Sequence, residues 1–94
     1  MSRQFEPRLE HMRTDISPDD TMFEGDYEHY FGVGRSALRC IGLAMSAAGR
    51  VGLSSIMDFA CGFGRVSRVL RAAFPGAQLS VCDISREAVD YCAD

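Results

Sequence analysis

A glycine-rich turn and two carboxylates are the residues of this chain whose types and spacing could do chemistry. The stretch IMDFACGFGR places Gly62 and Gly64 after an apolar run and before a helical pattern. Glycines allow a tight turn and close approach of a ligand, and the free N–H groups of a helix start point into the same space. Asp83 follows Gly64 by 19 residues, so it can accept hydrogen bonds from both hydroxyls of a ribose bound across the turn. The pattern predicts a nucleoside-type ligand.

Asp58 discriminates between ligands with and without phosphates. A nicotinamide or flavin dinucleotide would bring two phosphates to the turn, and a nearby carboxylate would repel them. Ser67 also stands where the dinucleotide fingerprint GxGxxG has Gly or Ala. S-adenosylmethionine has the ribose and no phosphate, and Asp58 would attract its cationic ammonium and sulfonium groups. The carboxylate of the ligand would be free to meet the helix N-terminus or Arg65. Two alternatives stay open: an acid that only ties down the loop through backbone N–H bonds, and an NAD-binding Rossmann module.

Two short apolar runs, residues 54–60 and 78–82, predict buried strands on either side of the turn and its helix. The helical crossover between them is short, so the strands should be parallel and linked right-handed. The order of elements is helix, strand, helix, strand, helix. This order predicts an α/β fold, the N-terminal portion of a doubly wound Rossmann-like sheet.

Three helical patterns accompany the strands. Apolar residues at three- and four-residue spacing predict a helix over residues 35–48, ended by Gly49. In the helix between the two strands, the apolar positions share one side. The other side carries three arginines at helical spacing, expected to be solvated: Arg65, Arg68 and Arg71. Ser85 is the expected N-cap of the helix that follows the second strand. Ile84 and Val89 would form a hydrophobic staple at the start of the last helix.

The charge of the chain is unevenly distributed. Residues 1–30 hold eight acids and three arginines, whereas residues 31–94 hold five acids and seven arginines. Within the acidic part, a serine cap followed by a proline and two aspartates predicts a short helix over residues 17–25. We therefore divide the chain into an acidic, solvated lead-in segment, residues 1–34, and a ligand-binding part, residues 35–94.

Composition excludes several classes of protein. The longest charge-free runs are far shorter than the roughly 20 apolar residues of a membrane span, so no membrane segment is expected. Neither part is basic enough to predict nucleic-acid binding. The four cysteines lack zinc-site spacing, so no metal is expected, and Cys61 and Cys82 should be buried packing residues. The N-terminus lacks the apolar core of a secretory signal, which predicts a cytoplasmic protein with reduced cysteines.

The turn and its acids resemble the motifs of a known family. The stretches IMDFACGFGR and LSVCDIS are similar to the first two cofactor motifs of class I S-adenosylmethionine-dependent methyltransferases. Residues 17–94 are similar to a group of bacterial members of that superfamily. The resemblance implies a Rossmann-like fold, S-adenosyl-L-methionine as cofactor, and methyl transfer to an unidentified acceptor. It also implies a cofactor site of nine residues: Asp58, Ala60, Cys61, Gly62, Phe63, Gly64, Arg65, Asp83 and Ile84.

The same resemblance implies a role for most residues of that site. Asp58, Gly62 and Gly64 would line the methionine end of the cofactor. Asp83 would bind the ribose hydroxyls. Ile84 would pack on the adenine, and Arg65 would bind the cofactor's carboxylate. Tyr30, in the lead-in segment, would cover the methionine end. Ala60 departs from the family pattern, because the first glycine of the motif is common there.

The full family fold contains more strands and helices than a chain of 94 residues can form. It implies a seven-stranded sheet whose third strand contacts the adenine and whose fourth carries the residues nearest the transferred methyl. The chain is therefore expected to be the N-terminal part of a methyltransferase domain, truncated, with half of the cofactor site and no activity by itself. No catalytic residue and no oligomeric state are predicted. A non-catalytic truncated remnant is the second alternative function.

Overall fold

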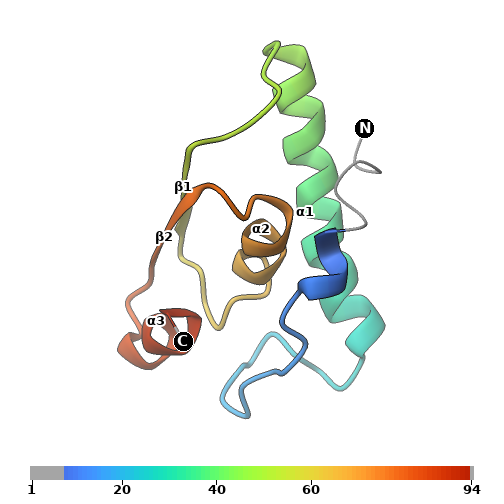
Figure 1. Cartoon of the computed structure of the whole chain (residues 1–94). Coiled ribbons are helices and arrows are strands. Elements are labelled where there is room, and N and C mark those ends of the chain that lie inside the picture. The colour runs from blue at the N-terminus through green and yellow to red at the C-terminus, as the bar shows by residue number, and fades with distance from the viewer. Residues whose placement is uncertain (1–7, 94) are drawn as a thin grey trace.

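Three helices and two strands make up the computed structural model, which describes residues 8–93 (Figure 1). Their order is α1 (Tyr27–Ala47), β1 (Ser55–Phe59), α2 (Ser67–Ala73), β2 (Gln78–Cys82) and α3 (Arg86–Ala93). This order and the positions of both strands confirm the predictions from the sequence. No helix among the described residues is both long and apolar enough to cross a membrane.

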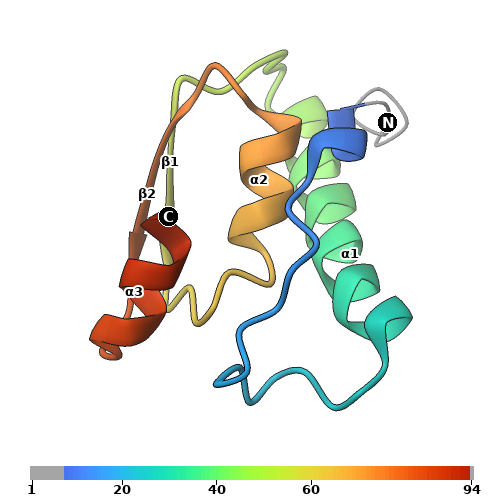
Figure 2. The ribbon, with the colours of Figure 1, turned by 60° about the horizontal axis from the view of Figure 1, so that its bottom comes forward.

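The strands β1 and β2 form a two-stranded parallel sheet, as predicted. Ile56 pairs with Leu79, and both side chains pack against the core. Helices α2 and α3 both contact β2 (Figure 2). Successive side chains of a strand point to opposite faces, so Met57 and Phe59 lie on the other face, where they are 67% and 81% exposed. The prediction of buried strands is wrong for this face, because the described helices cover only one side of the sheet.

The core lies between α1, α2 and the covered face of the sheet. Its buried apolar residues are Met12, Leu38, Met45, Val69, Leu70, Ala73, Phe74 and Ala77. The side of α2 that the apolar spacing predicts is the buried one. Met12 belongs to the lead-in segment, and Ser17 and Asp20 of the same segment are buried as well. The expectation of a solvated lead-in is therefore wrong, because this segment packs against α2.

Helix α1 begins at Tyr27 and not at residue 35. The carboxylate of Asp26 caps it by accepting a hydrogen bond from the backbone N–H of His29 at 3.1 Å. The first turns contain aromatic residues and glycines, which lower intrinsic helix propensity, and tertiary packing outweighs that cost. The helix ends at Ala47, one residue before the predicted end, and Gly49, which has a φ of +70°, follows its cap. The expected boundary after residue 34 therefore falls inside α1.

Residues 17–25 form two turns and no helix. The backbone N–H of Asp20 donates to the Ser17 carbonyl, and that of Phe23 donates to the Asp20 carbonyl. The carboxylate of Asp20 accepts from the hydroxyl of Tyr30 in α1. The predicted short helix is wrong because short polar side chains offer the backbone an alternative to helical hydrogen bonding.

The start of α3 agrees with the prediction only in part. The Ser85 hydroxyl accepts a hydrogen bond from the backbone N–H of Ala88 at 3.2 Å, as expected of a cap. Ile84, however, is fully exposed. The predicted staple with Val89 therefore does not form, and Ile84 stands free beside Asp83.

Gly34 allows α1 and α2 to approach closely. A Cβ there would lie 2.6 Å from Cγ2 of Val69 and 2.8 Å from the carbonyl oxygen of Arg65. We expect Gly34→Ala to lower the free energy of unfolding by about 1–3 kcal/mol, because overpacking forces the helices apart. Gly32→Ala is the control, since a Cβ at Gly32 meets nothing within 4 Å, and it should stabilise by up to about 1 kcal/mol. Urea unfolding measures both, and equal effects would contradict the close approach.

Candidate functional site

The glycine-rich turn follows β1, and Asp83 follows β2. Because parallel strands end at the same edge of a sheet, the two lie side by side. The backbone N–H of Cys61 donates to the carbonyl of Cys82 at 3.0 Å, and that of Gly62 donates to Oδ2 of Asp83 at 2.9 Å. The turn and the acid that the sequence pattern combines are thus in direct contact.

The turn contains three residues in left-handed conformations. Ala60, Gly62 and Gly64 have φ values of 60°, 56° and 89°, which glycine adopts freely and alanine only at a cost of about 1–2 kcal/mol. A Cβ on Gly62 would meet nothing within 4 Å, whereas one on Gly64 would lie 3.2 Å from Sγ of Cys92. The space over Gly62 is therefore open to a ligand, and Gly64 packs against α3.

Backbone N–H groups hold the carboxylate of Asp83 from two sides. Oδ1 accepts from Ser85 and Oδ2 from Gly62, both at 2.9 Å. These bonds, that of Ser85 first, lower the pKa of Asp83 below its ordinary value of 3.8. Each carboxylate oxygen has a second lone pair. The ionised side chain can therefore still accept hydrogen bonds from two ligand hydroxyls.

The lowered pKa of Asp83 predicts pH-dependent stability. A carboxyl with a lower pKa in the folded state stabilises the fold above its unfolded-state pKa, and the contribution is lost as the pH falls through the folded-state pKa. The difference in unfolding free energy between wild type and Asp83→Asn should be largest at neutral pH and shrink below pH 3.8. Urea unfolding over a pH series measures it, with Asp90→Asn, an exposed acid of α3, as the control. A difference independent of pH would contradict the assignment.

Asp58 is tied to the start of α2. The hydroxyl of Ser67 donates a hydrogen bond to Oδ2 of Asp58, and Ser67 is buried. A glycine or alanine at position 67, as in the dinucleotide fingerprint, could not make this bond. The sequence pattern identifies Ser67 only as a departure from that fingerprint, and the structure gives it a role in holding Asp58.

The other predicted site residues surround the turn in different environments. Phe63 packs on Tyr91 of α3 with ring centroids 5.8 Å apart. Cys61 is buried, as predicted, and Arg65 is half-buried just before α2. Ile84 offers a fully exposed apolar side chain next to Asp83.

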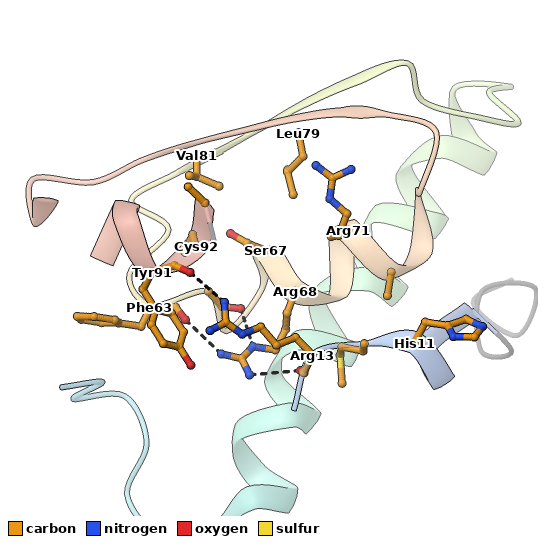
Figure 3. A pocket seen from close by; sticks show the side chains of 14 residues that line it. His11, Arg13, Phe63, Ser67, Arg68, Arg71, Leu79, Val81, Tyr91 and Cys92 are labelled. Carbon is orange, nitrogen blue, oxygen red and sulfur yellow. Dashed lines mark hydrogen bonds between the residues drawn. The ribbon is translucent and has the colours of Figure 1, made fainter. Parts of the chain in front are cut away.

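Arg68 is the site residue that the sequence pattern misses. It is only 6% exposed, so the prediction of a solvated side chain is wrong for Arg68, whereas Arg71 is exposed as predicted. Its guanidinium donates to five oxygens, the carbonyls of Arg13, Asp15, Phe63 and Gly64 and the hydroxyl of Tyr30. Figure 3 shows the guanidinium beside Arg13 and Phe63. We call this arrangement the Arg68 clamp. It joins two carbonyls of the glycine-rich turn to the lead-in segment.

Tyr30 links the Arg68 clamp to Asp20. Its hydroxyl accepts from Arg68 at 3.3 Å and donates to Oδ2 of Asp20 at 2.6 Å. Tyr30 is 1% exposed, and its burial is the main cause that raises the pKa of its hydroxyl. The resemblance implied that Tyr30 covers a ligand over the turn. That expectation needs correction, because the ring and its hydroxyl are enclosed by Asp20 and Phe23 and by Arg68 of α2.

A cavity of about 620 Å³ adjoins the clamp, between α2, α3, β2 and the lead-in segment (Figure 3). At its edge the guanidinium of Arg13 lies 4.0 Å over the ring of Tyr91 and binds the carboxylate of Asp15. Of the nine predicted site residues, only Phe63 and Gly64 line it. This cavity is therefore distinct from the open space over Gly62. No metal-binding group of His, Cys, Asp or Glu occurs within residues 8–93.

Comparisons with known proteins do not assign the chain to a family. No family model, no curated protein and no solved structure matches it.

Proposed function

We propose that this chain binds S-adenosylmethionine at the glycine-rich turn and serves methyl transfer, as a class I S-adenosylmethionine-dependent methyltransferase does. One observation carries the proposal. The carboxylate of Asp83 lies 2.9 Å from the backbone nitrogen of Gly62, over which the space is open. A ribose placed there would meet an ionised acceptor for both hydroxyls.

Electrostatics support a cationic ligand over a dinucleotide. The pKa of the Cys61 thiol is raised to about 12, by burial first, then by Cys92, and further by the carboxylates of Asp58 and Asp83. Two negative groups thus act on the same turn. Their field would favour the ammonium and sulfonium of S-adenosylmethionine and oppose the phosphates of NAD.

The surroundings of Asp83 support an adenosine. Ile84 presents a fully exposed apolar side chain next to the carboxylate, where an adenine ring could pack on it. The parallel strands with a helix between them, and a site outside their carboxyl ends, support a Rossmann-like fold as part of the proposal. A cytoplasmic location, in which the four cysteines would stay reduced, is part of the proposal.

Methyl transfer is an in-line displacement, in which the protein mainly aligns the donor with the acceptor. The residues of the turn hold the donor in this proposal. Asp83 orients the ribose, Gly62 leaves room for the ligand, and the Arg68 clamp keeps the carbonyls of Phe63 and Gly64 in place.

Calorimetric titration of the 94-residue chain with S-adenosylhomocysteine and, separately, with NAD tests the proposal. Circular dichroism on the same sample establishes that the chain is folded. We expect saturable binding of S-adenosylhomocysteine and none of NAD. Binding of NAD alone would replace the proposal by an NAD-binding module, and a folded chain that binds neither would favour a non-catalytic role.

A further inference from the structure

Two thiols from distant parts of the chain meet beneath the glycine-rich turn. Sγ of Cys61, in the turn, lies 3.8 Å from Sγ of Cys92, in the last turn of α3. Both sulfurs also approach the carbonyl oxygen of Gly62, at 3.3 Å and 3.4 Å. Gly64 makes room for this contact, because a Cβ there would lie 3.2 Å from Sγ of Cys92.

We propose that Cys61 and Cys92 form a reversible disulfide that ties the glycine-rich turn to α3. The sulfurs must approach by about 1.8 Å to reach the S–S bond length of about 2.05 Å. The two thiols are free, so no other bond has to break first.

The exposure of the two thiols sets the order of the chemistry. Cys92 is half-buried and Cys61 is buried, so an oxidant such as hydrogen peroxide reaches Cys92 first. The Cys92 thiol loses its proton, its thiolate attacks one peroxide oxygen, and the O–O bond breaks. The departing hydroxide takes up that proton, so that a sulfenic acid and water result. The Cys61 sulfur then attacks the Cys92 sulfur, the S–O bond breaks, and a second water leaves. The thiol pair loses two electrons, and the peroxide gains them.

The neighbouring groups make this oxidation slow near neutral pH. Burial is the largest cause that raises the pKa of both thiols. Together with Cys92 and the carboxylates of Asp58 and Asp83, it raises the pKa of Cys61 to about 12. At Cys92, Asp58 acts in the same direction, while the guanidinium groups of Arg68 and Arg13 oppose it. The reaction is therefore best tested at mildly alkaline pH, where more thiolate is present.

The disulfide would also act on the proposed cofactor site, a consequence that rests on the proposed function. Gly62 accepts both thiol contacts through its carbonyl and donates its N–H to Asp83. Pulling Cys61 towards α3 would displace Gly62 and break its alignment with the carboxylate. We expect the oxidised chain to lose saturable binding of S-adenosylhomocysteine, and dithiothreitol to restore it.

Trypsin digestion after oxidation tests the bond directly. The chain has no lysine, and cleavage after arginine places each cysteine in its own peptide: residues 40–50, 51–65, 72–86 and 87–94. The chain is treated with hydrogen peroxide, unreacted thiols are alkylated, and the peptides are analysed by mass spectrometry with and without reduction. We expect one linked pair, 51–65 with 87–94, lighter by two hydrogen atoms than the sum of its peptides. Only two cysteines should then react with the alkylating reagent.

Two variants make the result specific. Cys40→Ser removes an exposed thiol and should leave the linked pair unchanged, whereas Cys92→Ser should abolish it. A chain that yields only sulfinic or sulfonic acids, or links through residues 40–50 between molecules, would overturn the disulfide. If the linked pair forms but the oxidised chain binds S-adenosylhomocysteine as the reduced chain does, the proposed effect of the disulfide on the cofactor site is wrong. If the reduced chain does not bind, the proposed function fails and the peptide result still decides on the disulfide.

Discussion

Replacing Arg68 by methionine should lower the free energy of unfolding by about 3–5 kcal/mol. Methionine has a similar length but no donors. Five oxygens would therefore each lose one hydrogen bond, two of them in buried and three in partly buried positions. Each unsatisfied buried acceptor costs about 1–3 kcal/mol, and rearrangement of the chain recovers part of this. Chemical denaturation followed by circular dichroism measures the effect.

Arg71→Met is the matched control for this experiment. Arg71 lies one turn further along α2 and is exposed, so its replacement should change stability by no more than about 0.5 kcal/mol. The loss of unfolding free energy in Arg68→Lys should fall between those of the two methionine variants. An ammonium keeps the charge but cannot reach five acceptors in the geometry of a guanidinium. Equal stability of the two methionine variants would show that the Arg68 clamp does not hold the fold together.

Asp83→Ala should weaken binding of S-adenosylhomocysteine by about 2–4 kcal/mol, or roughly 30- to 700-fold. The change removes two charge-assisted hydrogen bonds to the ribose hydroxyls, each of about 1.5–3 kcal/mol, and water compensates part of the loss. Calorimetric titration of both proteins measures the difference. Asp90→Ala removes the same charge from the exposed side of α3 and should bind as wild type does.

The loss at Asp83 also has a structural component, because the same carboxylate holds the backbone of Gly62 and Ser85. A ligand without the ribose 2′-hydroxyl separates the two effects. Wild type should bind this ligand more weakly than S-adenosylhomocysteine, whereas Asp83→Ala should bind the two equally, as a double-mutant cycle requires. If the variant still discriminates between the ligands, another group binds the hydroxyl and the ribose assignment is wrong.

The residues around the turn show what a pattern of spacing can predict. Gly62 and Gly64 after an apolar run, and Asp83 after the next one, are local signals within one strand–helix–strand unit. Parallel pairing of the two strands then requires that the turn and the acid meet at the same edge. The contact between Gly62 and Asp83 follows from these facts alone.

Arg68 and Ser67 show where such a pattern fails. Periodicity divides α2 into an apolar and a polar side and assigns the arginines to solvent. At Arg68, however, the lead-in segment covers the polar side, and the Asp15 carbonyl, 53 residues earlier in the chain, accepts a hydrogen bond from this arginine. In the sequence, Ser67 is only a departure from the dinucleotide fingerprint GxGxxG. The structure shows its role, which is a hydrogen bond from its hydroxyl to Asp58.

The sequence by itself determined the order of the elements, both strands, the glycine-rich turn and the acid opposite it. These features depend on neighbours a few residues away and on the short crossover between two strands. The tertiary structure decided which polar groups are buried, that Cys61 and Cys92 are in contact, and that Met57 and Phe59 stand exposed. The physical reason is that burial depends on which distant segment covers a given face, and spacing along the chain carries no information about that cover.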